Sequence, residues 1–126
     1  MLSPGQLRRF SGYNPGDHRL LRDRLGATRE KLENESDARF GIELFFTENS
    51  DAGRTERFLV RARELVPLAE IYVIPVAAGS RYFIRVTYGS YTDREAAAAA
   101  TQRLPQKYQD AFKFVLRSFH ELRSSI

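Results

Sequence analysis

The 126-residue sequence contains no cysteine, no tryptophan, one methionine and two histidines. Without cysteine, the chain has no disulfide, no thiol nucleophile and no thiolate metal site. No apolar run is long enough to span a membrane or to form the core of a signal peptide. We therefore expect any membrane attachment to come from a segment outside this chain.

Signals for catalysis are equally sparse. His18 and His120 lie near opposite ends of the chain in polar segments, with no nucleophile or metal-ligand spacing beside them. The segment GSYTD lacks the spacing and the lysine of a phosphate-binding loop, and the acidic residues are scattered singly. We expect a protein that is not an enzyme and that uses no metal and no cofactor.

The remaining composition is that of an ordinary soluble domain, with 42% hydrophobic and 29% charged residues. The length suits one domain with a real core. Twenty basic residues against 16 acidic ones give a net charge of +4, spread along the chain. This mild excess permits binding to an acidic polymer without requiring it.

Two segments precede the expected domain. Residues 1–17 are rich in proline and glycine, which predicts an irregular or disordered leader. Residues 18–39 predict a helical extension with Asp17 as a plausible N-cap. Its apolar positions follow one helical stripe: Leu21, Leu25, Thr28 and Leu32.

Residues 40–122 alternate between strand and helix patterns, and residues 123–126 are expected to be a polar tail. Strands are predicted at 41–47, at 70–77, at 82–88 after the hairpin segment AAGSR, and at 111–119. Pro75 places the second strand at a sheet edge. One helix is predicted before Pro67, and a second begins at Thr92, with Glu95 completing a capping box.

The resulting order, β-α-β-β-α-β after one helix, predicts an α+β ferredoxin-like or RNP-like fold. Two helices would cover one face of a four-stranded antiparallel sheet. Alternation in the first strand places Ile42, Leu44 and Phe46 on the core face. The open face is expected to carry the following residues of the first and third strands, which should be central neighbours: Glu43, Phe45, Thr47, Phe83, Arg85 and Thr87. Glu43 and Arg85 are interpreted first as a cross-strand ion pair.

The segment FIRVTYGSYTDREAAAAATQRLP resembles the second half of the SPOR (sporulation-related repeat) domain. The resemblance is carried by Arg85-Val86, Gly89, Tyr91, the run Asp93-Arg94-Glu95-Ala96 and Leu104. The triplet IEL takes the place of the aliphatic-Gln-aliphatic triplet of that family. The resemblance extends over residues 40–122 and is strongest to DamX-like proteins of proteobacteria.

The SPOR resemblance implies a non-catalytic module that binds peptidoglycan glycan strands, preferably those stripped of stem peptides, and brings a larger envelope protein to the division septum. It implies a periplasmic location and possible divisome or envelope partners. The ligand is expected on the open sheet face, with Glu43 at the family's glutamine position and Phe83 at its aromatic position. A further aromatic is Phe112 or Phe114, because the register of the last strand is open.

Three alternatives remain open. The fold pattern is also that of RNA-binding RNP domains, but RYFIRVTY lacks their Gly-aromatic-Gly/Ala-Phe core, so no nucleic acid is expected. A second alternative is a protein–protein interaction module on a SPOR-like fold. Finally, the leucine stripe of the helical extension needs a partner, and that partner is either the body of the domain or the open face itself, over Phe45 and Phe83.

Overall fold

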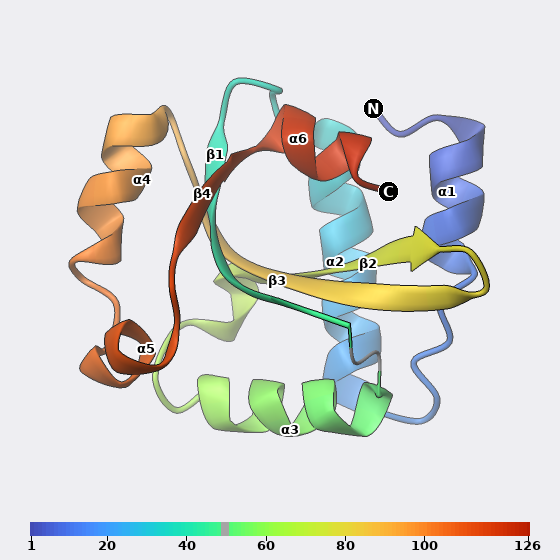
Figure 1. Cartoon of the computed structure of the whole chain (residues 1–126), viewed down its shortest axis with the longest axis horizontal. Helices are drawn as coiled ribbons and strands as arrows, with labels where there is room; N and C mark the ends of the chain where they lie inside the picture. Colours follow the sequence, from blue (N-terminus) through green and yellow to red (C-terminus); the bar gives the residue numbers. More distant parts are fainter. Residues whose placement is uncertain (49–50) are drawn as a thin grey trace.

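Four antiparallel strands form the centre of the protein in the order β2-β3-β1-β4. Figure 1 shows them in the computed structural model, which describes residues 1–48 and 51–126. The predicted α+β class is confirmed, and so is the prediction that the first and third strands are central. The strands are β1 (Phe40–Thr47), β2 (Ile71–Ala78), β3 (Arg81–Tyr91) and β4 (Val115–Ser118).

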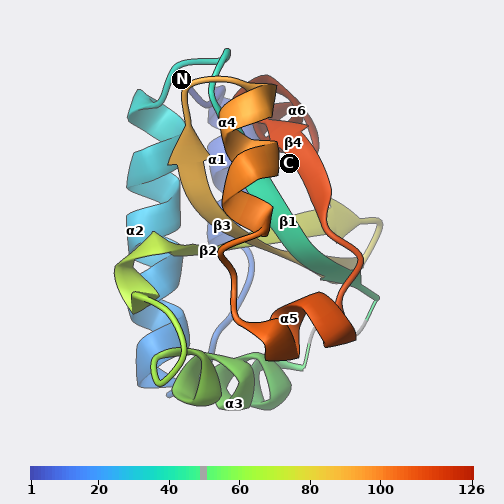
Figure 2. The ribbon, with the colours of Figure 1, turned by 90° about the vertical axis from the view of Figure 1, so that its left-hand side faces the viewer.

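Helices lie on both sides of this sheet. The first side carries α3 (Ala52–Ala62), α4 (Arg94–Thr101) and α5 (Gln106–Ala111). The second side carries α1 (Pro4–Ser11) and α6 (Phe119–Ser124), while α2 (Arg19–Asn34) runs along β2. Figure 2 shows α4 in front of the strands, with α1 and α6 behind them. A short 3-10 turn, η1 (Leu68–Glu70), leads into β2. The face that the sequence predicts to be open is therefore covered in part.

The proline- and glycine-rich leader is not irregular throughout. Pro4 occupies the first turn of α1, where a missing N–H costs nothing, and Ser3 forms a capping box with Gln6. Phe10 is buried, and Gln6 Nε2 donates to the carbonyl of Arg123, 2.8 Å away. The prediction of a disordered leader is wrong for this segment, because Pro4 starts the helix instead of breaking it.

The C-terminal end is also structured. Ser118 and Glu121 form a second capping box, and α6 follows β4 without a linker. Phe119, Leu122 and the final Ile126 are buried. The predicted polar tail at 123–126 is therefore wrong, and the predicted fourth strand at 111–119 shortens to the four residues of β4.

The helical extension covers the free edge of β2. The predicted leucine stripe is confirmed as buried, although His18 and not Asp17 occupies the cap position. Arg24 Nε donates to the carbonyl of Ile71 at 2.9 Å, and Thr28 Oγ1 accepts from the backbone N–H of Val73 at 2.9 Å. These bonds occupy backbone groups that β2 would otherwise leave exposed at the sheet edge, which protects that edge from pairing with another chain.

The junction between β3 and α4 requires its glycine. Gly89 has φ of +75°, and a Cβ atom there would lie 2.5 Å from the ring of Tyr91. Only glycine adopts this backbone at low cost. The helix then begins after Asp93, whose side chain accepts from the N–H of Ala96, so Asp93 is the cap where the sequence predicts Thr92. Within the described residues, no helix is both long and apolar enough to cross a bilayer.

The contacts of Glu35 are expected to make the stability of the fold decrease in acid. Its carboxylate joins the end of α2 to β3 by accepting from Lys31 Nζ at 2.9 Å and from Ser90 Oγ at 2.7 Å. Although desolvation raises the pKa of Glu35, the hydrogen bonds from Lys31 and Ser90 outweigh it and lower the pKa from 4.5 to about 2. Since the folded-state pKa is depressed, the stabilisation is present above about pH 4.5 and is lost as the pH falls towards about 2.

As the pH falls from about 4.5 to about 2, we expect the free energy of unfolding to decrease by about 1 kcal/mol more in wild type than in Glu35→Gln, after allowing for solvent screening. Urea denaturation at several pH values measures the difference. Glu30→Gln, on the exposed face of the same helix, is the control and should follow wild type. Identical pH profiles for wild type and Glu35→Gln would contradict the account of this contact.

Candidate functional site

A bulge in β1 decides which side chains reach the second face of the sheet. Glu43 pairs with Thr87, whereas Phe45 pairs with the next residue of β3, Val86, so β1 contains one extra residue between them. Beyond this point Phe46 pairs with Arg85. Directly opposed residues of two strands share a face. Phe46 therefore lies on the same face as Arg85, where strict alternation would have turned it inward.

The bulge sends Phe45 and Thr47 to the opposite side. Thr47 pairs with the buried Ile84, and the Phe45 ring lies 5.1 Å from that of Phe58 in α3. The Phe112 ring is 5.4 Å from Phe45, on the same side. The prediction that Phe45 and Thr47 belong to the open face is wrong, and Phe112 does not reach that face either.

Two further predicted residues do not line the open face. Thr87 lies opposite Glu43 and so shares its face, but Thr87 is fully buried, and its hydroxyl has no hydrogen-bond partner within residues 1–48 and 51–126. Phe114 is half-buried against the core ahead of β4. Of the eight residues expected on the open face, Glu43, Phe83 and Arg85 come together there.

Glu43 is the centre of this group. Its side chain is buried, and Oε1 accepts from Arg85 Nε at 2.6 Å and from Arg117 Nε at 3.2 Å. The predicted Glu43–Arg85 ion pair is therefore confirmed. The second arginine comes from β4, where Arg117 pairs with Gly41. Arg117 also lies 3.5 Å from the exposed carboxylate of Glu121, so the two guanidinium groups face two carboxylates, and the buried Glu43 holds both arginines in place.

Two aromatic rings complete the surface. The Phe46 and Phe83 ring centroids are 5.4 Å apart, and the guanidinium carbon of Arg85 lies 4.6 Å from the Phe46 centroid. Phe46 is 40% exposed, whereas the Arg85 side chain is 12% exposed. Stacking on the ring and pairing with Glu43 together fix the guanidinium. We call this set the Glu43 cluster: Glu43, Phe46, Phe83, Arg85 and Arg117.

The helices α1, α2 and α6, which lie outside the predicted β-α-β-β-α-β pattern, leave this cluster accessible. Tyr72 and Ile74 share its face but are buried, and Arg24 of α2 lies 5.7 Å above the Tyr72 ring. Phe119 and Leu122 of α6 lie beside Gly41, 3.8 Å from where its Cβ would be. The added helices thus pack over the β2 edge and the start of β1. Phe46 and Val115 remain exposed.

Sequence reasoning missed Phe46 and Arg117. The run Leu44-Phe45-Phe46 breaks the alternation of β1, and this was the available sign of a bulge. Arg117 would have followed from the register of the last strand, which the sequence left open.

The described part of the chain holds no group of three or more histidine, aspartate or glutamate side chains able to bind a metal ion. His120 lies 3.8 Å from Asp37, and both side chains are exposed. Arg123 lowers the pKa of Asp37 by a hydrogen bond, and the same guanidinium joins α6 to the end of α2.

Comparison of the chain with protein-family models, with curated proteins and with solved structures gave no match in any of the three. The resemblance to the SPOR family therefore rests on the residues of the sequence.

Proposed function

We propose that this chain is a non-catalytic, SPOR-like module that binds peptidoglycan glycan strands, preferring strands without stem peptides, through the Glu43 cluster. The observation that carries the proposal is the exposed Phe46 ring, flanked by Phe83 and stacked on the paired guanidinium of Arg85. In this proposal the chain brings a larger envelope protein to the septum, in the periplasm, with divisome or envelope proteins as further partners.

The chemistry of the cluster suits a stripped glycan. A sugar ring has a flat apolar face that packs against an aromatic side chain, and its hydroxyl and N-acetyl groups need polar partners at the rim. Removal of the stem peptide leaves a free carboxylate on the lactyl group of each muramic acid. Arg85 and Arg117 pair with Glu43, and Arg117 also lies 3.5 Å from Glu121; their remaining guanidinium N–H groups supply charge-assisted donors for that carboxylate.

The proposal also accounts for the acid at the family's glutamine position. A glutamine donates and accepts, whereas a glutamate only accepts. Here Glu43 accepts from both arginines, so the donors of the site are their remaining guanidinium N–H groups. The arginines thus replace the amide as the polar anchor beside Phe83.

Co-sedimentation of the purified chain with isolated sacculi tests this function. Three preparations are compared: intact sacculi, sacculi stripped by an amidase, and stripped sacculi whose carboxylates have been converted to amides. Retention of the chain is expected to be strongest on the stripped sample and weaker after amidation. In a separate assay, the chain should not bind a single-stranded RNA probe. Equal retention on all three preparations, or none on any, contradicts the proposal.

Phe46→Ala is expected to weaken retention on stripped sacculi about tenfold, because the exposed ring is the apolar platform of the site. Phe83→Ala should act in the same direction. The cost in folding free energy of Phe46→Ala should stay near 1 kcal/mol, since the ring is largely exposed. Leu65→Ala, which truncates a similarly exposed apolar side chain elsewhere, is the matched control and should bind like wild type. Unchanged retention in folded Phe46→Ala would exclude this surface.

A further inference from the structure

A second surface lies on the opposite side of the sheet from the Glu43 cluster. A cleft of about 280 Å³ opens between the end of β1, α3 and the segment after α5. Three rings form its apolar lining: Phe45, Phe58 and Phe112. Thr47 and the buried Thr55 add hydroxyl groups. These are residues that the glycan-binding proposal does not use.

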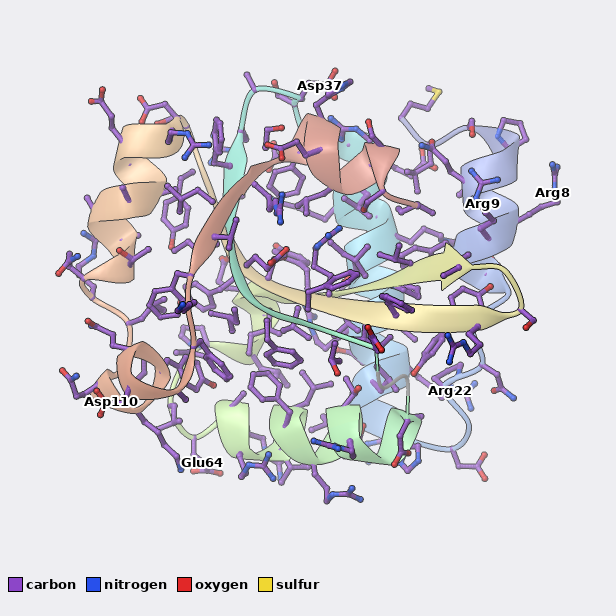
Figure 3. All side chains as sticks on the ribbon, viewed as in Figure 1. Arg8, Arg9, Arg22, Asp37, Glu64 and Asp110 are labelled. Atoms are coloured by element: carbon purple, nitrogen blue, oxygen red, sulfur yellow. The ribbon has the colours of Figure 1, made fainter. Side chains whose placement is uncertain are left out.

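The rim of the cleft is positively charged. Arg54 and Arg61, both exposed, stand on either side of Phe58 along α3, and both line the cleft. Within the described residues neither makes an ion pair. The acids Glu64 and Asp110 lie at the outer edge of the molecule in Figure 3, and within the described residues neither makes an ion pair with the rim. The cleft is therefore matched to a ligand that carries negative charge.

The aromatic lining continues into the core at Tyr108. Its ring centroid lies 5.4 Å from that of Phe112 and 6.2 Å from that of Phe58. The Tyr108 hydroxyl is buried, and within the described residues it has no hydrogen-bond partner. A buried hydroxyl without a partner is uncommon in a packed core. The aromatic rings around the cleft therefore lie beside a buried hydroxyl group that has no hydrogen-bond partner within the described residues.

The size of the cleft limits what it can hold. About 280 Å³ is at the lower limit of small-molecule sites, and it suits one large side chain better than a whole cofactor. The aromatic lining favours a ligand with an aromatic side chain, and the arginines on both sides favour acidic residues next to that side chain in the ligand. We propose that this cleft binds an acidic peptide segment of a partner protein, with one aromatic side chain inserted between Phe45, Phe58 and Phe112.

Because the cleft and the Glu43 cluster lie on opposite sides of the sheet, a glycan strand and a peptide bind without competing. The peptide site does not depend on the proposed glycan function. A domain held on the cell wall by one face would carry its partner on the other.

NMR titration of the 126-residue chain tests this proposal with a synthetic peptide that has one phenylalanine between aspartate and glutamate residues. Saturable shifts are expected at amides around the cleft, with none at Glu43, Arg85 or Arg117. The same peptide with alanine for phenylalanine, or with lysines for the acids, should bind at least about tenfold more weakly.

Paired charge reversals test the rim. Arg54→Glu with Arg61→Glu should weaken peptide binding about tenfold or more. Arg57→Glu with Arg63→Glu, which reverses two exposed arginines that do not line the cleft, is the matched control and should retain binding. An equal loss of peptide binding in both double variants would mean that the effect comes from net charge alone, and it would overturn the proposed site.

Other occupants of the cleft give different results. Shifts at the cleft that grow with protein concentration alone, with dimers in sedimentation, would assign it to a second copy of the chain. Binding to vesicles of anionic phospholipid that depends on Arg54 and Arg61, without peptide binding, would assign it to a membrane surface. Either result overturns the peptide proposal.

Discussion

Arg123→Met is expected to lower the free energy of unfolding by about 3 kcal/mol. The Arg123 side chain is almost fully buried, and Nη1 donates to the carbonyls of Leu32 and Glu35, each 2.9 Å away. The last carbonyls of a helix have no partner within the helix itself. Nη2 also bonds to the Asp37 carboxylate. Methionine fills much of the volume but leaves two carbonyls at the end of α2 without their donor.

This large effect is expected because Arg123 joins three elements. It lies in α6, satisfies the end of α2, and accepts at its own carbonyl from Gln6 of α1. Urea denaturation measures the loss, and Arg22→Met, an exposed arginine of α2 labelled in Figure 3, should change stability by no more than about 0.5 kcal/mol. A loss below about 1 kcal/mol for Arg123→Met would mean that α6 does not anchor the N-terminal helices.

Glu43→Gln separates the structural role of the carboxylate from its role in binding. The substitution keeps the side-chain size but removes the charge that Arg85 and Arg117 share. Arg85 is 12% exposed and cannot turn fully to solvent, whereas Arg117 is 33% exposed and can. We expect a loss of about 2 kcal/mol in folding stability, less than for a fully buried pair.

For binding, the same substitution makes the local charge one unit more positive, with Glu121 still beside Arg117. Retention on stripped glycan, compared at equal amounts of folded protein, should be unchanged or stronger. A loss of more than about tenfold would show that the carboxylate itself is required at the ligand. In an Arg85→Leu background the stability cost of Glu43→Gln should shrink, because Arg85, the charge that this substitution leaves unpaired, is already gone. An unchanged cost would mean that the two residues are not coupled.

The sequence predicted the sheet well because its signals are local. The β2–β3 hairpin has Gly79 at φ of +64°, the edge position of β2 suits Pro75, and the α4 stripe buries Ala97 and Ala100. Each of these signals depends on a few neighbouring residues. The ferredoxin-like order follows once they are placed.

The errors arose where one residue has two interpretations. By composition Pro4 and Gly5 predict a break in helical structure, although Ser3 and Gln6 three positions apart form a capping box and proline suits the first turn. Ser118 and Glu121 have the same spacing before α6. Both helices are short, so a periodicity argument does not detect them.

The candidate site was harder to predict than the fold. One extra residue in β1 exchanges the faces of Phe45 and Phe46, because side chains alternate with a period of two. The same shift moved Phe45 from the proposed glycan surface to the aromatic cleft. Arg117 depends on the long-range pairing of β4 with β1, which no local pattern encodes.

The central claim is that the Glu43 cluster binds stripped glycan, and NMR titration with soluble, amidase-treated glycan strands tests it most directly. The predicted result is saturable shifts concentrated on residues 43–46, 83–85 and 115–117, with little change around α3. Absence of any shift in the folded chain would contradict glycan binding. Shifts confined to α1 and α2, or to the cleft beside Phe58, would contradict the placement of the site.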